Sequence, residues 1–304
     1  MDDDGGRLAL ILERARSKGL AASGTGTVSK QVPGLDAVAS ERFAISVALH
    51  DGRVLSSGDA SVAFSLQSIS KLFSLCALLQ VEPGAWEHVG WEPSDAAYRS
   101  ISELEHRGGR PRNPFVNAGA LVATDRLQSR TGDAVQATLE LIRAQCGSRR
   151  VRSIPAVARA EQESDHINAA IAHVLAEHGR LANPIPVVLR QYTRQCAIAA
   201  STEEVARAAL FLAGPGRTDA PLDAESRRRV NAVMLTAGTY DAAGDIAYRV
   251  GIPVKSGIGG GIVGVMPGVG SVCVWSPPLD SRGNSVGGIA ALEELSRLGG
   301  WSLF

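Results

Sequence analysis

The stretch AFSLQSISKLFSLCALL, residues 63–79, changes from a strand-like to a helix-like pattern at Ser68. Upstream, residues 41–66 alternate and turn at Asp51-Gly52, which predicts a β-hairpin followed by a third short strand. We therefore expect the chain to pass from a strand directly into a helix whose first turn contains Ser68. From that point apolar residues recur with a period of 3.6, at Ile69, Leu72, Phe73, Cys76 and Leu79.

Ser68 and Lys71 are three positions apart, so on a helix they lie on the same face. The chain has only four lysines and takes its other basic residues from arginine. Unlike arginine, a desolvated lysine can lose its proton and act as a general base. A serine hydroxyl needs such a base to become a nucleophile, and a helix N-terminus offers N–H groups to a developing oxyanion. The pair therefore predicts serine-dependent acyl transfer.

A second lysine motif strengthens this interpretation. VKSGIGGG, residues 254–261, places Lys255-Ser256-Gly257 on an expected strand. S-x-x-K together with a strand K-T-G is the signature of β-lactamases and penicillin-binding proteins. The S-D-N motif of those enzymes is absent from the sequence.

The order of the predicted elements indicates the architecture. Strands are expected near both ends of the chain, with helices between them and a last helix near residues 284–300. Ser201 and Glu204 form a capping box, and Gly147 and Gly179 are expected to end helices. The predicted class is α+β, with a sheet domain from residues 1–94 and 236–304 and a helical domain, residues 95–235, inserted between its strands.

Composition excludes several classes of protein. The 304 residues carry no net charge, which argues against a nucleic-acid or anionic-membrane partner. No window approaches the ~18 apolar residues of a membrane span, and the acidic start is unlike a signal peptide. Four cysteines without CxxC spacing favour a reduced, cytoplasmic compartment. His173 and His178 are five apart, so we expect no metal site.

Longer blocks resemble a known family. FSLQSISKLFSL, NPFVNAGALV, QYTRQCAI and the region from AGTYDAAGD to NSVGG are similar, in order and spacing, to the blocks of serine-dependent glutaminases. The resemblance runs from about residue 26 to residue 288. It implies a β-lactamase-like fold and hydrolysis of L-glutamine to L-glutamate and ammonia. It also implies no cofactor and a homodimer or homotetramer.

The resemblance assigns roles to individual residues. Ser68 would be the nucleophile, Lys71 its base and Tyr240 a proton relay, with the N–H groups of Ser68 and Ile258 as the oxyanion hole. Glu161 would hold the α-amine of the substrate, since a free amine pairs with a carboxylate. The remaining substrate-binding residues would be Gln67, Asn117, Asn168 and Tyr192.

Three departures from the family pattern affect the expected substrate. Gln31 stands where the family has tyrosine, His166-Ile167 replace a different dipeptide, and Ala197 replaces serine. Three alternatives therefore remain: an amidase for another ω-amide, a penicillin-recognising serine hydrolase, and a glutamine-binding protein without turnover. The missing S-D-N motif disfavours the second, and the intact Ser68, Lys71 and Tyr240 disfavour the third.

Overall fold

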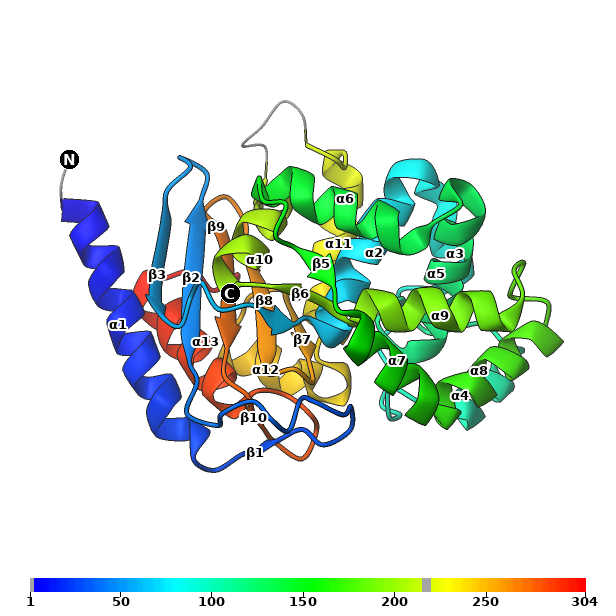
Figure 1. The fold of residues 1–304 in the computed structure, drawn as a ribbon. Helices are drawn as coiled ribbons and strands as arrows, with labels where there is room; N and C mark the ends of the chain where they lie inside the picture. The colour runs from blue at the N-terminus through cyan, green and yellow to red at the C-terminus, as the bar shows by residue number, and fades with distance from the viewer. Residues whose placement is uncertain (1–2, 215–219) are drawn as a thin grey trace.

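A five-stranded antiparallel sheet forms one half of the molecule, and most of the helices form the other half (Figure 1). The computed structural model describes residues 3–214 and 220–304. The strand order is β3-β2-β9-β8-β7, so the sheet joins strands from both ends of the chain, as predicted. Its strands are β2 (Ala44–Leu49), β3 (Val54–Gly58), β7 (Val254–Gly257), β8 (Gly261–Met266) and β9 (Gly270–Trp275).

Alternate side chains of each strand point to opposite faces of the sheet, and helices cover both faces. Ile45 and Val47 of β2 pack with α1 (Asp3–Ser23) and α13 (Val286–Gly299), which lie against each other. Ala44 and Ala48 face a second apolar cluster, and α10 (Thr202–Ala209) crosses this face along β2 and β9. The sheet is therefore the middle layer of three.

Helix α2 (Ser70–Val81) is the centre of the helical half. Its sequence is apolar almost all round, as expected for a buried helix, and α5, α6 and α9 pack against it. The helices not yet named are α3 (Trp86–Val89), α4 (Ile101–His106), α5 (Asn117–Thr131), α6 (Ala134–Cys146), α7 (Pro155–Ser164), α8 (His166–Glu177), α9 (Ile185–Cys196), α11 (Ala224–Ala237) and α12 (Ala243–Arg249).

Short strands connect the two halves. β4 (Phe64–Ser65), the predicted third strand, pairs with β6 (Ile198–Ala200), which also pairs with β5 (Arg152–Ser153). β1 (Thr27–Val28) pairs with β10 (Pro278–Leu279). The pairing of β4 with β6, and the contacts of the Gln67–Ile69 turn with β7 and α9, place the segment around Ser68 between the sheet and α9.

Local signals in the sequence account for several boundaries. The hairpin at residues 51–52, the capping box of Ser201 and Glu204, and the left-handed Gly147 after α6 are present as predicted. The helix expected from Ser68 begins instead with a 3₁₀ turn (Gln67–Ile69) that leads into α2. Gln67, the first residue of this turn, has a left-handed φ of 48°, which does not occur inside a regular α-helix.

The proposed division at residues 95 and 235 stays a prediction. Helix α10 falls inside the proposed helical insert by sequence, yet it packs on the sheet. No helix in the described ranges is long and apolar enough to cross a membrane.

Candidate active site

The turn that holds Ser68 lies where the sheet meets the helices. The Leu66 N–H donates to the Ile198 carbonyl at 2.7 Å, which fixes the start of the turn. Ser68 is partly exposed, whereas Lys71, one turn later in α2, is only 4% exposed. Ser68 thus borders a cavity, whereas Lys71 is enclosed by protein.

Lys71 is held by two oxygen acceptors. Its Nζ donates to the Phe115 carbonyl at 3.1 Å and to Asn117 Oδ1 at 2.6 Å. Asn113 Oδ1 accepts from the N–H groups of Phe115 and Val116, which positions the loop that supplies these acceptors. Burial lowers the pKa of Lys71 to about 8, although Glu161 raises it in part. A useful fraction of Lys71 is therefore neutral near pH 8.

A chain of amides connects Lys71 to the start of α8. Asn117 Nδ2 donates to Asn168 Oδ1 at 2.8 Å, and Asn168 Nδ2 donates to the Asp165 carboxylate. Asp165 also caps α8, because its Oδ1 accepts from the Asn168 N–H at 3.1 Å. His166, by contrast, is exposed and does not line the cavity described below. Three residues of the SDHIN block, Ser164, Asp165 and Asn168, therefore lie on the cavity wall, whereas the departing His166 does not.

Glu161 on α7 is a buried carboxylate with spare hydrogen-bonding capacity. It is 7% exposed, and its Oε2 has no hydrogen-bond partner within the described ranges. Burial raises the pKa of Glu161 to about 7, and the nearby Asp165 adds to the rise. A cationic ligand group would satisfy the free oxygen.

Tyr240 lies next to both site lysines. Lys255 Nζ donates to the Tyr240 hydroxyl at 3.3 Å and lies 4.4 Å from its ring centroid, whereas Lys71 Nζ lies 5.7 Å from that centroid. Burial holds the pKa of Lys255 well below its usual range, and the charge of Lys71 lowers it further. Burial raises the pKa of Tyr240, while its hydrogen bond with Ser68 opposes the rise. Tyr240 therefore links the serine to Lys255.

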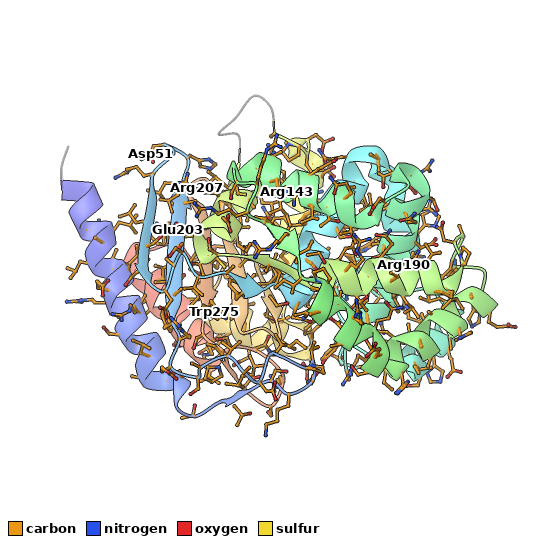
Figure 2. The ribbon with its side chains drawn as sticks, viewed as in Figure 1. Asp51, Arg143, Arg190, Glu203, Arg207 and Trp275 are labelled. Carbon is orange, nitrogen blue, oxygen red and sulfur yellow. The ribbon has the colours of Figure 1, made fainter. Side chains whose placement is uncertain are left out.

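Two glycines allow the end of β7 to touch the turn of Ser68. A Cβ on Gly257 would lie 2.5 Å from the Leu66 carbonyl oxygen, and one on Gly259 would lie 2.2 Å from the Ser65 oxygen. Trp275, labelled in Figure 2, donates from Nε1 to the Gly259 carbonyl at 3.0 Å and so fixes this segment. Between the glycines, the Ile258 N–H donates to no acceptor in the part of the chain that the structure describes.

A cavity joins these groups. The predicted residues on its wall are Gln67, Ser68, Asn117, Glu161, Asn168, Tyr192 and Ile258. Lys71 and Tyr240 are not on the wall but contact residues that are. Gln31, one of the departures, also lies on the wall. Sequence reasoning missed six further wall residues: Val32, Tyr98, Arg99, Ser164, Asp165 and Cys196.

Tyr98 could have been found from tyrosine usage. The chain has only four tyrosines, and three of them, Tyr98, Tyr192 and Tyr240, lie at this site. The Tyr98 ring packs 4.7 Å from that of Tyr240, and its hydroxyl donates to Gln31 Oε1 at 3.2 Å. Ala197 is buried outside the cavity wall.

Comparison with known proteins identifies the family. A profile of the family described as Glutaminase matches residues 26–304. A glutaminase from Streptomyces coelicolor is 48% identical over 298 residues, which is 97% of each chain. The chain belongs to the glutaminase family. A glutaminase from Paraburkholderia phytofirmans is similar at 46% identity over 97% of this chain and 99% of its own.

Solved glutaminase structures share the fold. One described as "Probable glutaminase ybaS" has a TM-score of 0.93 and 32% identity, and covers 100% of this chain and 99% of its own. The Bacillus subtilis glutaminase YbgJ, solved as a covalent complex with 5-oxo-L-norleucine formed from 6-diazo-5-oxo-L-norleucine, has a TM-score of 0.86 at 29% identity. It covers 97% of this chain and 99% of its own. The predicted α+β, β-lactamase-like fold is confirmed.

Proposed function

We propose that this glutaminase-family chain hydrolyses L-glutamine to L-glutamate and ammonia through an ester on Ser68. The observation that carries the proposal is the buried Lys71, one helical turn from Ser68, with a pKa of about 8. Family membership supports glutamine as the substrate, and the relatives named above are glutaminases.

The first half of the reaction forms the ester. Neutral Lys71 accepts the Ser68 proton while the serine oxygen attacks the γ-carbonyl carbon of glutamine. The N–H groups of Ser68 and Ile258 stabilise the resulting oxyanion. When the tetrahedral intermediate collapses, the C–N bond breaks and the nitrogen takes the proton through Tyr240, so ammonia leaves.

The second half restores the enzyme. A water molecule gives its proton to Lys71 and attacks the γ-glutamyl ester. The ester C–O bond breaks, the proton returns to the serine oxygen, and glutamate is released. Glu161 pairs with the α-amine through both halves, and Gln67, Asn117, Asn168 and Tyr192 enclose the substrate.

Ammonia release tests the nucleophile. Ser68→Ala should abolish turnover of glutamine, and 6-diazo-5-oxo-L-norleucine should add mass to the wild-type peptide that contains Ser68. The matched control is Ser70→Ala, since the Ser70 hydroxyl is buried and makes no hydrogen bond within the described chain. A Ser68→Ala protein with a tenth of wild-type activity would overturn the assignment. Labelling by a β-lactam would favour a penicillin-recognising hydrolase.

We also propose a cytoplasmic location and a homodimer or homotetramer. The four cysteines are free and buried, which supports a reduced compartment. The oligomeric state follows from the resemblance to glutaminases alone. Light scattering of the purified chain would measure it, and a monomer at micromolar concentration would contradict it.

A further inference from the structure

Arg99 is a cation on the cavity wall that the assigned roles leave unused. It is exposed, and its guanidinium lies 5.4 Å from the ring centroid of Tyr98. No carboxylate pairs with it within residues 3–214 and 220–304. Charged surface residues generally keep a protein soluble, but Arg99 lies on the wall of a cavity.

The loop that presents Arg99 is anchored on both sides. The Asn117 N–H donates to the Tyr98 carbonyl at 2.9 Å, which ties the loop to the residue that holds Lys71. Ser100 caps α4 by accepting from the Glu103 N–H at 3.2 Å. The backbone on either side of Arg99 is therefore fixed relative to the catalytic groups.

The side chain beneath Arg99 is also positioned. Tyr98 donates its hydroxyl to Gln31 Oε1 at 3.2 Å and packs its ring against Tyr240. The ring thus offers a fixed π-face to the guanidinium. Gln31, the departure noted in the sequence, acts as a positioning residue for Tyr98.

The charges of the cavity match those of an amino acid. Glu161 offers a buried carboxylate oxygen without a partner, and Arg99 offers a guanidinium without a carboxylate. The two buried lysines already have acceptors, because Lys71 donates to Phe115 and Asn117 and Lys255 donates to Tyr240 and the Ser256 carbonyl. A zwitterionic α-amino acid supplies the two missing partners, because its amine suits Glu161 and its carboxylate suits a guanidinium fork.

We propose that Arg99 is a specificity-determining residue that binds the α-carboxylate of the substrate, positioned by Tyr98 and Gln31. The inference deepens the proposed function and rests on it, since it assumes that the cavity binds glutamine. It adds a charged contact to the amide and hydroxyl side chains of the other predicted substrate-binding residues, Gln67, Asn117, Asn168 and Tyr192.

Paired substrates isolate the contact. 4-Aminobutanamide has the amine and the scissile amide of glutamine but no α-carboxylate. We expect wild type to prefer glutamine strongly in kcat/KM. Arg99→Gln should raise the KM for glutamine about tenfold or more, with kcat changed less than about twofold, and should leave 4-aminobutanamide unaffected. Arg99→Lys should fall between the two, because it keeps the charge but not the fork.

An exposed arginine outside the cavity serves as the control. Arg190→Gln, on α9 and exposed outside the cavity wall, should leave both substrates unchanged (Figure 2). An unchanged glutamine KM in Arg99→Gln, or an equal loss on both substrates, would overturn the proposal. The equal loss would mean that Arg99 only supports the structure.

A binding assay separates this proposal from the proposed reaction. Calorimetry with L-glutamate and with 4-aminobutanoate measures the same carboxylate preference without turnover. Arg99→Gln should weaken binding of L-glutamate about tenfold and leave 4-aminobutanoate unchanged. If this loss appears in a protein that releases no ammonia, Arg99 keeps its role and the glutaminase reaction fails. If L-glutamate binds Arg99→Gln and wild type equally, the proposal for Arg99 fails.

Discussion

The pH dependence of kcat/KM should reveal two groups that must both lose a proton. Lys71 accepts the Ser68 proton only when neutral, and its pKa is about 8. Glu161 pairs with the substrate amine only when ionised, and its pKa is about 7. Both pKa values belong to the free enzyme, which is what kcat/KM reports. Activity should therefore fall toward acid and approach a plateau above pH 8.5.

The magnitude follows from the two pKa values. At pH 7 about one-tenth of Lys71 is neutral and about half of Glu161 is ionised, so kcat/KM should be about 5% of the plateau. At pH 6 the same fractions are about 1% and 10%, so about 0.1% remains. The logarithmic slope should thus steepen from about one near pH 7.5 toward two below pH 6.5.

Glu161→Gln should change the profile in a defined way. It removes the lower of the two ionisations, so the acid slope should fall to about one, while the KM for glutamine rises because the amine loses its partner. The Glu161 charge also raises the pKa of Lys71, so the remaining midpoint should shift below pH 8. Glu163→Gln, exposed on the same helix, is the matched control and should reproduce the wild-type profile.

Ammonia release measured from pH 5.5 to 9.5 at constant ionic strength would test the reasoning. The loss of the substrate's own ammonium charge at high pH is corrected from its titration in solution. A wild-type profile that is flat between pH 6.5 and 8.5 would refute the role of Lys71 as a base. A Glu161→Gln midpoint that moves to higher pH would refute the electrostatic coupling.

Two further substitutions test packing around the site. Gly257→Ala would place a Cβ 2.5 Å from the Leu66 carbonyl, so the serine turn must shift and kcat should fall about a hundredfold, whereas Gly244→Ala meets open space and should be neutral. Steady-state kinetics of both proteins would decide, and a fully active Gly257→Ala would contradict the contact. Gln195→Leu would leave the Thr124 and Ser74 hydroxyls without their buried partner and should cost about 2–4 kcal/mol in urea unfolding. The exposed Gln162→Leu should change the free energy of unfolding by less than about 0.5 kcal/mol. Equal losses of this free energy in both variants would contradict the stabilising role of the Gln195 hydrogen bonds.

The sequence predicted those features that depend on local chemistry. The turn at Asp51-Gly52 and the capping box of Ser201 both rest on spacings of a few residues. The predicted wall residues of the cavity came from the resemblance to the glutaminase family, carried over position by position despite the departures at Gln31, His166-Ile167 and Ala197. Such features can be predicted because residues that are close in the sequence determine them.

Features that depend on contacts between distant parts of the chain could not be predicted from the sequence. Tyr98 and Arg99 lie on a loop without periodicity, and contacts with residues distant in sequence, Asn117, Gln31 and Tyr240, hold that loop at the cavity. Strand β4 was predicted, but its two residues carry no signal for the pairing with β6, which tertiary packing sets. The left-handed Gln67 gives no sequence signal, because a strained backbone is imposed by its surroundings.

The central position of β2 has a consequence for synthesis on the ribosome. β2 can pair with β3 as soon as both have emerged, but its other edge stays open until β9 is made near the end of the chain. An open edge is a template for aggregation, so the nascent chain must be protected for most of translation. Tyr240 and Ile258 also arrive late. A transcript truncated before Tyr240 would therefore yield a chain that holds Ser68 and Lys71, lacks Tyr240 and Ile258, and leaves an edge of β2 without β9.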